Sequence, residues 1–221
     1  MRPIKEKKKR LDLLLKRLID LFCSFLGLIV LSPLILILFL LIWFKLGWPV
    51  FFIQERPGRN GKTFKMIKFR TMTNAHDTKG NLLTDQMRTS KLGRIIRKNS
   101  LDELPELFNV LIGNMSLVGP RPLLTKYLPY FNNREKKRHD MKPGITGLAQ
   151  INGRNLLEWD ERLEMDVKYV ENFSIWLDIK ILLLTGFNVI RHKDVLAVSS
   201  EFIPDFDDYR KNQLKKKSFG N

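Results

Sequence analysis

Residues 21–44 have the sequence LFCSFLGLIVLSPLILILFLLIWF, an apolar run without a single charged residue. At about 1.5 Å per helical residue, such a run is long enough to cross a hydrocarbon core of about 30 Å. A signal peptide fits poorly, because the run is too long and no small-residue cleavage site follows it. The run therefore predicts a membrane segment.

Two features indicate that this segment enters the membrane without crossing it. Ser32 and Pro33 lie near its middle, and proline removes an amide donor and clashes with the preceding turn, so the helix should break there. Both flanks are rich in lysine and arginine, which favours the same membrane face for both ends. We expect a re-entrant helix broken at Ser32-Pro33, with Trp43 and Trp48 at headgroup level. A straight span is the alternative, since helices that contain proline also cross bilayers.

The amino-acid composition limits the classes of binding partner that the protein can have. Lysine and arginine total 39 against 23 aspartate and glutamate residues, a formal net charge of +16. This surplus predicts anionic partners: nucleic acid, anionic lipid or phosphorylated substrates. Cys23 is the only cysteine, which excludes an intrachain disulfide, and a Cys/His zinc site is not expected. A mean hydropathy of −0.18 excludes a protein made of many membrane spans.

The fold class that we expect is α+β and mainly helical, with one main domain that carries a small β-hairpin on the membrane segment. We divide the chain into a basic N-terminal arm (1–17), the re-entrant helix (18–46), the main domain with interfacial helices (47–198) and a polar tail (199–221). The arm lies next to an apolar insertion, so we expect it to attract anionic lipid. The tail is expected to be loose.

Within the main domain, hydropathy patterns and turn residues predict the individual elements. They are strands at 50–54 and 63–70 around a turn at 56–61, helices at 87–99, 101–112 and 123–140, a glycine-rich connector at 142–155, a helix from Glu158, and an apolar helix at 175–190. Asp178 and Lys180 make the last of these a poor membrane span, and an interfacial or core-packed helix fits better.

Asp102 and Glu103 are the acidic residues that are the best candidates for a catalytic role. One interpretation is structural: Ser100 and Glu103 have the spacing of a capping box, and carboxylates favour the first turn of a helix. Pro105 conflicts with that register, because it would then fall past the first turn. The spacing alone leaves both a cap and a catalytic pair open.

Basic residues near the acidic pair favour a site for phosphate and metal. Arg97 precedes the pair, and Arg121 lies between two prolines in a stiffened loop. Mg²⁺ prefers carboxylate oxygens together with substrate phosphates, and guanidinium groups match phosphate geometry. A surface salt bridge is the alternative for Arg121. Lys68 belongs to another basic stretch, which by itself indicates only the end of a strand, and Arg154 is a weak candidate for a phosphate contact.

A series of short motifs follows in order along the chain: Ser32-Pro33, Gln54 to Gly58, Lys68 to Met72, Ser100 to Pro105, Leu107 to Leu111, Val118 to Pro122, Arg138 to Asp140, and Pro143 to Gln150. With these motifs the chain resembles the small monotopic phosphoglycosyl transferases of the bacterial sugar transferase family, PglC-like enzymes in particular. The resemblance extends from about Lys16 to Val195. Two departures are a longer basic arm and Glu106, where glutamine is common.

The resemblance implies the reaction and its site. Asp102 and Glu103 would be the catalytic pair and would hold Mg²⁺. The residues that contact substrate phosphate would be Lys68, Arg97 and Arg121, joined by an acidic position at Asp166 and by the candidate Arg154. A phosphosugar would pass from a UDP-sugar to polyprenyl (undecaprenyl) phosphate through an aspartyl-phosphosugar, with release of UMP.

The implied location is the bacterial inner membrane, with the catalytic domain (47–198) facing the cytoplasm and anionic lipids as further partners. No extra multi-span domain precedes the apolar run, so we expect the minimal catalytic form. One alternative is a membrane-tethered basic protein that binds lipid or nucleic acid without catalysis. We do not favour it, because its surface would avoid an acidic pair. The second alternative is a glycosyltransferase that transfers a sugar without phosphate and releases UDP.

Overall fold

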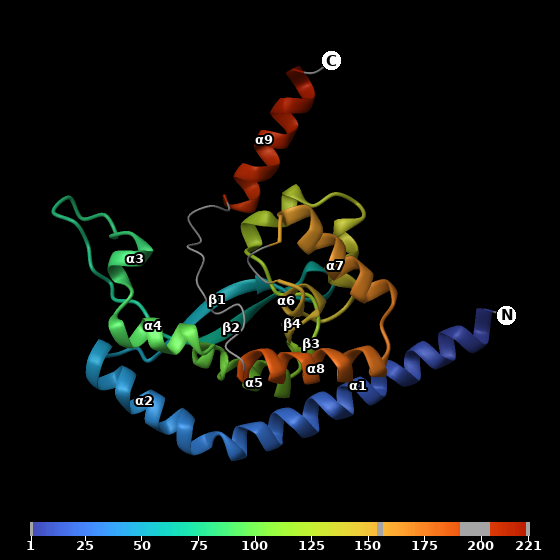
Figure 1. Cartoon of the computed structure of the whole chain (residues 1–221), viewed down its shortest axis with the longest axis horizontal. Coiled ribbons are helices and arrows are strands. Elements are labelled where there is room, and N and C mark those ends of the chain that lie inside the picture. Colours follow the sequence, from blue (N-terminus) through green and yellow to red (C-terminus); the bar gives the residue numbers. More distant parts are fainter. Residues whose placement is uncertain (1, 154–156, 191–203, 220–221) are drawn as a thin grey trace.

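The computed structural model describes residues 2–153, 157–190 and 204–219. Its main domain lies on a long bent pair of helices (Figure 1). The elements, with 3-10 helices labelled η, are α1 (Arg2–Val30), α2 (Ser32–Leu46), β1 (Phe51–Pro57), η1 (Arg59–Gly61), β2 (Thr63–Phe69), α3 (Asp85–Arg88), α4 (Lys91–Lys98), η2 (Leu101–Glu103), α5 (Glu106–Leu111), β3 (Ser116–Val118), η3 (Thr125–Tyr130), η4 (Glu135–Asp140), β4 (Gly144–Thr146), α6 (Leu148–Ile151), α7 (Trp159–Glu171), α8 (Ile175–Ile190) and α9 (Phe206–Phe219).

Helices α1 and α2 form the bent pair and meet at Leu31 with a bend of 61°. Pro33 lies in the first turn of α2, where its missing N–H is not needed, and the Ser32 hydroxyl donates to the Ile29 carbonyl (2.7 Å). The predicted break at Ser32-Pro33 is therefore confirmed. Among the described residues, no single helix is both long and apolar enough to cross a bilayer, whereas α1 from Arg10 and α2 meet these criteria as a pair.

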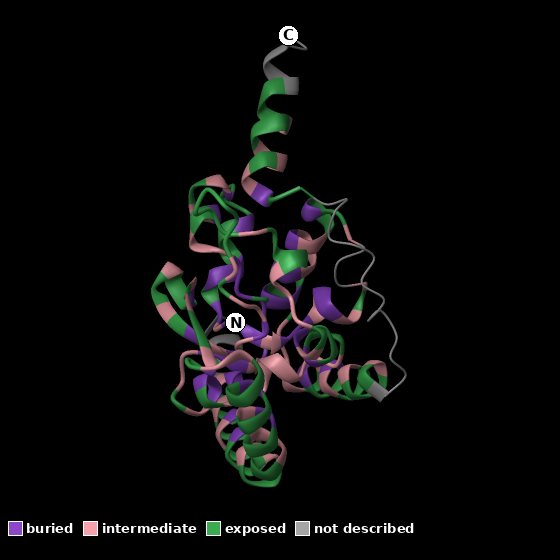
Figure 2. Ribbon diagram, turned by 90° about the vertical axis from the view of Figure 1, so that its left-hand side faces the viewer, coloured by how far each residue is buried: buried purple, intermediate pink, exposed green. Residues whose placement is uncertain are grey.

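The bent pair and α8 expose large apolar side chains. Examples are Phe22 and Phe25 on α1, Phe44 on α2, and Trp176 and Leu183 on α8. In Figure 2 the exposed residues, in green, dominate the lower helices, while buried residues gather in the domain above them. Continuous apolar surfaces of this kind mark contacts with membranes or partners.

Helix α1 is fixed to the main domain by buried polar contacts. Lys16 forms an ion pair with Asp178 of α8 (2.6 Å) and donates to a β3 carbonyl, and the Tyr169 hydroxyl also donates to Asp178 (2.7 Å). Arg17 donates to two carbonyls at the end of α5, and Asp20 accepts from the start of β3. The helix has no break between the predicted arm and the membrane segment.

The end of α2 is fixed to the hairpin by Arg70, which follows β2. Its guanidinium donates to the carbonyls of Leu46, Gly47 and Trp48, which have no partners within the helix. The ring of Phe51 at the start of β1 packs against Phe39 of α2. Both arms of the bent pair are thus attached to the main domain.

Strands β1 and β2 form the predicted antiparallel hairpin, with Phe51 opposite Phe69 and Pro57 opposite Thr63. The turn requires left-handed backbone at Asn60 (φ 57°) and Gly61 (φ 73°), two residue types that adopt this conformation readily.

Asn109 of α5 joins that helix to β2. Its side-chain oxygen accepts from the Ile67 amide (3.0 Å) and its amide nitrogen donates to the Lys65 carbonyl (2.8 Å). The side chain is fully buried. Because Glu106 lies one turn earlier on α5, this contact also fixes Glu106 beside the strand that carries Lys68.

Substitution of Asn109 by leucine should lower the free energy of unfolding by about 2–4 kcal/mol, because it leaves two backbone groups of β2 buried without partners. Denaturant titration of the protein in detergent measures this loss. The control is Asn152→Leu, at an exposed position whose amide bonds only within its own turn, and it should change stability by less than about 0.5 kcal/mol. Equal stability losses in the two variants would contradict the role given to Asn109.

Four parts of the main domain differ from expectation. Residues 101–112 form the turn η2 and the helix α5 instead of one helix. Residues 87–99 form two helices, and residues 123–140 form η3 and η4 instead of one α-helix. The connector at 142–155 contains β4, which pairs in parallel with β3, and the short helix α6. The α7 and α8 predictions are confirmed.

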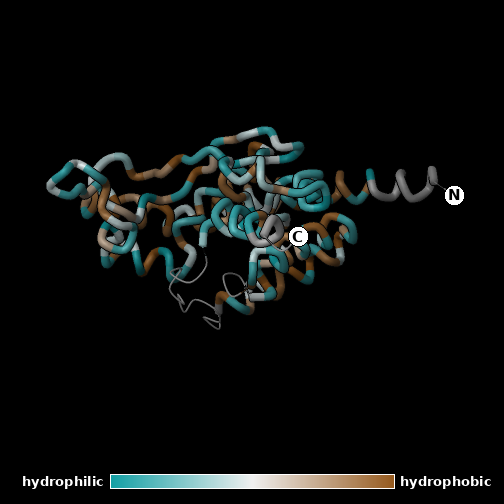
Figure 3. The backbone as a smooth tube through the Cα atoms, turned by 90° about the horizontal axis from the view of Figure 1, so that it is seen from above, coloured by the Kyte–Doolittle hydropathy of each residue, from teal (hydrophilic) through white to brown (hydrophobic). Residues whose placement is uncertain are grey.

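The expectation of a loose tail is wrong for residues 204–219. Phe206 at the start of α9 is fully buried among Tyr127, Phe131 and Trp159, and the Trp159 indole donates to the Pro204 carbonyl (2.9 Å). The rest of α9 is largely hydrophilic, as the teal helix beside the C-terminal mark in Figure 3 shows, and it points away from the bent pair in Figure 1. Phe206 and the ion pairs of Arg210 with Glu135 and Asp160 attach this largely polar segment to the domain.

Candidate active site

The backbone around the acidic pair is unusual. Ser100 adopts a left-handed conformation (φ 54°) and its side chain makes no capping hydrogen bond. Asp102 and Glu103 then occupy the separate turn η2, and Pro105 caps α5. The capping-box interpretation is therefore wrong. A serine held in this region costs about 1 kcal/mol or more, which the surrounding structure must offset.

Glu103 is held by two cations from different elements. Its Oε1 contacts Nζ of Lys68 on β2 (2.8 Å) and Nη2 of Arg121 in the loop after β3 (2.6 Å). Although burial opposes ionisation, Arg121 and Lys68 lower the pKa of Glu103 to about 2. Lys68 also contacts Glu106 (3.1 Å), and burial together with the charge of Glu103 raises the pKa of Glu106 to about 7. Glu106 was not predicted as a site residue, although its departure from the family pattern had been noticed.

Asp102 is different, because no hydrogen bond or ion pair joins its carboxylate to another residue of the described chain. Burial and the neighbouring Glu103 charge raise its pKa, against the opposing charges of Lys68 and Arg97. Arg97 is exposed at the end of α4, and its Nε donates to the Thr71 hydroxyl (2.8 Å). Asp102 is thus the member of the pair whose oxygens are free to react or to bind a cation.

Asp166 lies behind this cluster instead of within it. It is only 2% exposed and forms an ion pair with Arg138 (2.7 Å), which is also 2% exposed. The same Arg138 nitrogen donates to the Arg121 backbone carbonyl (2.6 Å). The role of Asp166 as a phosphate contact stays a prediction, and in this structure its carboxylate is linked to the Arg121 carbonyl through Arg138. Arg138 belonged to a matching motif, but nothing in the sequence indicated its partner.

The predicted phosphate residues therefore divide into groups. Lys68 and Arg121 meet at Glu103, the charge of Arg97 acts on Asp102, and Arg154 lies outside the described residues.

The acidic pair can provide some, but not all, of the ligands of a Mg²⁺ ion. In the described ranges, no three His, Cys, Asp or Glu side chains converge as a complete metal site. Mg²⁺ needs only one or two carboxylates when substrate phosphates and water complete its octahedron. The unpaired carboxylate of Asp102, whose ionisation is opposed by burial and by Glu103, suits such a cation.

His139 makes folding sensitive to acid. Its Nε2 is buried without a partner, and its ring packs against Phe131. Burial and the Arg138 charge lower the pKa of His139 to about 4, from an ordinary value of about 6.5. Its contribution to stability is therefore fully present above about pH 6.5 and is lost as the pH falls toward about 4.

Between about pH 7.5 and about pH 5, wild-type protein should lose about 2 kcal/mol more stability than a His139→Phe variant. Unfolding at both pH values measures this difference. Parallel losses in the two proteins would exclude His139 as the cause.

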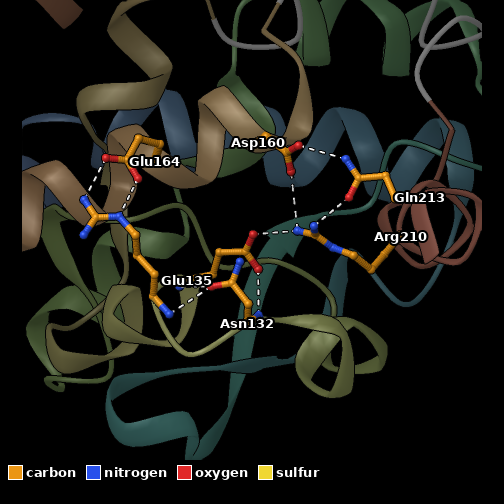
Figure 4. Close-up of a pocket in the computed structure, with 7 residues that line it drawn as sticks. Asn132, Glu135, Asp160, Glu164, Arg210 and Gln213 are labelled. Atoms are coloured by element: carbon orange, nitrogen blue, oxygen red, sulfur yellow. Dashed lines mark hydrogen bonds and ion pairs between the residues drawn. The ribbon is translucent and has the colours of Figure 1, made fainter. Parts of the chain in front are cut away.

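A pocket away from the acidic pair lies between η4, α7 and α9. Its volume is about 560 Å³ and its lining is charged (Figure 4). Arg210 of α9 contacts Glu135 (2.5 Å) and Asp160, while Arg134 contacts Glu164 (2.7 Å). These side chains satisfy one another and attach α9 to the domain, so the cavity does not add to the candidate active site.

Comparison with known proteins gives consistent matches. A family model described as bacterial sugar transferase matches residues 11–192. The uncharacterized sugar transferase EpsL of Bacillus subtilis is 55% identical over 178 residues, which cover 80% of this chain and 88% of EpsL. Undecaprenyl-phosphate galactose phosphotransferase of Salmonella typhimurium is 40% identical over 83% of the chain, and UDP-glucose:undecaprenyl-phosphate glucose-1-phosphate transferase of Klebsiella pneumoniae is 42% identical over 80%. The match covers only 42% and 40% of these two relatives, so the chain corresponds to about two-fifths of their length.

Proposed function

The chain belongs to the bacterial sugar transferase family, and from this premise we propose that it transfers a sugar phosphate from a UDP-sugar to undecaprenyl phosphate or a similar polyprenyl phosphate. The observation that carries the proposal is the free Asp102 carboxylate beside Glu103, which Lys68 and Arg121 hold. The names of the Salmonella and Klebsiella relatives support the two substrates.

The proposed reaction has two displacements at one phosphorus. An Asp102 oxygen attacks the β-phosphorus of the UDP-sugar, the bond to the bridging oxygen breaks, and UMP leaves with that electron pair. A polyprenyl phosphate oxygen then attacks the same phosphorus and displaces the Asp102 carboxylate. The product is a polyprenyl diphosphosugar.

The main obstacle to both steps is repulsion between anions, and cations fixed in advance lower it. Glu103 holds Lys68 and Arg121 close to the reacting phosphorus, and Arg97 approaches Asp102 from α4. Mg²⁺, bound by Asp102 with support from Glu103, would neutralise phosphate charge when present.

We also propose that the bent pair enters one leaflet of the bacterial inner membrane and returns, with the catalytic domain in the cytoplasm. The exposed apolar surface of the pair and of α8 would lie in the bilayer. The excess of basic residues suits anionic headgroups and both substrates. This arrangement brings the acidic pair to the level of a lipid phosphate.

Screening UDP-sugars with undecaprenyl phosphate and Mg²⁺ for release of UMP tests the proposal. UMP release with lipid-linked product supports it, whereas release of UDP indicates transfer of sugar without phosphate. Binding of anionic vesicles without nucleotide release from any UDP-sugar would instead favour a tethered binding protein.

A further inference from the structure

Four arginines of the described chain outside the predicted site have a buried Nε without a hydrogen-bond partner: Arg56, Arg70, Arg162 and Arg210. Arg70 donates to three backbone carbonyls and Arg210 forms ion pairs with two carboxylates, whereas Arg56 and Arg162 have fewer partners. Arg56 lies near the end of β1 and Arg162 lies on α7, and both side chains are half-buried. The Nε atom of each is buried and has no hydrogen-bond partner. An unsatisfied buried donor costs about 1–3 kcal/mol, so each position calls for an explanation.

Each guanidinium is held in place without being neutralised. Arg56 donates from Nη2 to the Gln54 side chain (2.7 Å), and Arg162 donates from Nη2 to the Leu157 carbonyl (3.2 Å). The Arg162 guanidinium also lies over the Trp159 ring, 4.5 Å from its centre. No ion pair between either arginine and a carboxylate occurs in the described structure, so neither guanidinium has an anionic partner.

Contacts of neighbouring residues place Arg121 near both arginines. Asp166, one turn after Arg162 on α7, pairs with Arg138, which donates to the Arg121 carbonyl. Pro57, next to Arg56, lines a small cavity together with Arg121.

Burial and the charge of Arg121 lower the pKa of Arg56 to about 10, and the same two causes, in the same order, lower the pKa of Arg162. Glu106 acts on Arg56 in the opposite direction, and Asp166 does so on Arg162. However, Glu106 is paired with Lys68, and Asp166 with Arg138. Arg121 therefore repels both other guanidinium groups, and a bound polyanion would reduce that cost.

We infer that Arg56, Arg121 and Arg162 together bind the diphosphate of the nucleotide sugar. Guanidinium groups present paired donors that match phosphate oxygens, and three of them from separate elements surround a group with two phosphates. The inference rests on the proposed function and adds two substrate-binding residues to it.

The register of the hairpin favours the nucleotide over the lipid as the ligand. Lys68 lies opposite Phe52, and Arg56 lies opposite Phe64 on the same face, four residues further from α2. At about 3.3 Å per residue, Arg56 is about 13 Å further along the strand from the membrane helix than Phe52. Helix α7, which carries Arg162, also lies above α1 and α8 in Figure 1. The arginines thus lie on the side of the acidic pair that a soluble donor reaches.

The test uses Arg56→Gln and Arg162→Gln in the full-length protein in detergent. Each variant should raise the KM for the UDP-sugar and weaken UMP binding by about tenfold, the loss expected for one charge-assisted contact of about 1.4 kcal/mol. Binding of uridine, which lacks phosphate, and the KM for undecaprenyl phosphate should stay within about twofold. Lysine at either position should recover part of the affinity.

Two matched controls remove one exposed positive charge from the same regions. The control variants are Arg59→Gln and Lys168→Gln. Arg59 lies in the hairpin turn, and Lys168 lies on α7. Neither variant should change UMP affinity. This result would distinguish a specific binding site from general electrostatic attraction by the basic protein. Thermal unfolding of every variant checks the fold.

The outcomes separate this inference from the proposed function. If wild-type protein releases UMP but Arg56→Gln and Arg162→Gln bind UMP normally, the inference is wrong and the proposed function stands. A raised KM for undecaprenyl phosphate alone would assign the site to the lipid phosphate and overturn the nucleotide assignment. If wild-type protein releases no UMP from any UDP-sugar but still binds UMP through these arginines, the proposed transfer fails while the phosphate site stands.

Discussion

Asp102→Asn should reduce UMP release at least about a thousandfold, because an amide is not a nucleophile and the neighbouring groups cannot replace it. The substitution should leave the melting temperature unchanged or slightly higher. The reason is that burial and Glu103 already oppose ionisation of this carboxyl, so a neutral group of the same shape relieves that cost. Turnover and thermal unfolding of the same preparations measure the two effects.

The matched control is Asp85→Asn, an exposed carboxylate in the first turn of α3, which should retain full turnover. Intact mass spectrometry adds a direct observation. Wild-type protein given a UDP-sugar without polyprenyl phosphate should gain the mass of one phosphosugar, and Asp102→Asn should not. A variant that keeps more than about a tenth of the turnover would remove Asp102 from the role of nucleophile.

Arg138→Leu should have the largest effect on stability, a loss of about 3–5 kcal/mol, because it leaves Asp166 charged, buried and unpaired. Asp166→Leu should cost a similar amount, since it leaves the Arg138 charge without its partner. The double variant should be more stable than either single variant, because it contains no buried unpaired charge. Denaturant titrations of the four proteins form a double-mutant cycle.

The same cycle tests whether Arg138 positions Arg121. In the double variant the Arg121 carbonyl loses its hydrogen bond, so the KM for the UDP-sugar should rise severalfold even though stability recovers. Recovery of both stability and KM would show that the buried pair serves folding alone.

Sequence patterns predict the structure correctly where one local rule determines it. The Ser32-Pro33 break follows from the missing proline N–H, and the β-hairpin follows from its turn residues and alternation. Helix α8 follows from an apolar run that only Asp178 and Lys180 interrupt. The pairing of Lys68 and Arg121 around Glu103 agrees with the charge pattern that had singled these residues out.

The sequence could not provide what depends on long-range contacts. Strands β3 and β4 are only three residues long and exist because they pair with each other. Phe206 orders α9 by entering a cluster formed by residues far earlier in the chain. Arg56 belongs to the motif Gln54 to Gly58, but the sequence assigns no role to it or to Arg162, because a buried nitrogen without a partner is a property of the folded molecule.

Anchorage of the bent pair at both arms has a practical consequence for chimeric transferases. Residues 1–46 carry Lys16, Arg17 and Asp20, whose partners lie on α8, α5 and β3, while the carbonyls at the end of α2 need Arg70. If this segment were grafted onto another catalytic domain, those charged side chains would have no partners unless the recipient domain supplied matching groups. The transplantable unit is therefore the segment together with its four docking positions, and donor sequences for such grafts can be chosen by those positions before overall identity is considered.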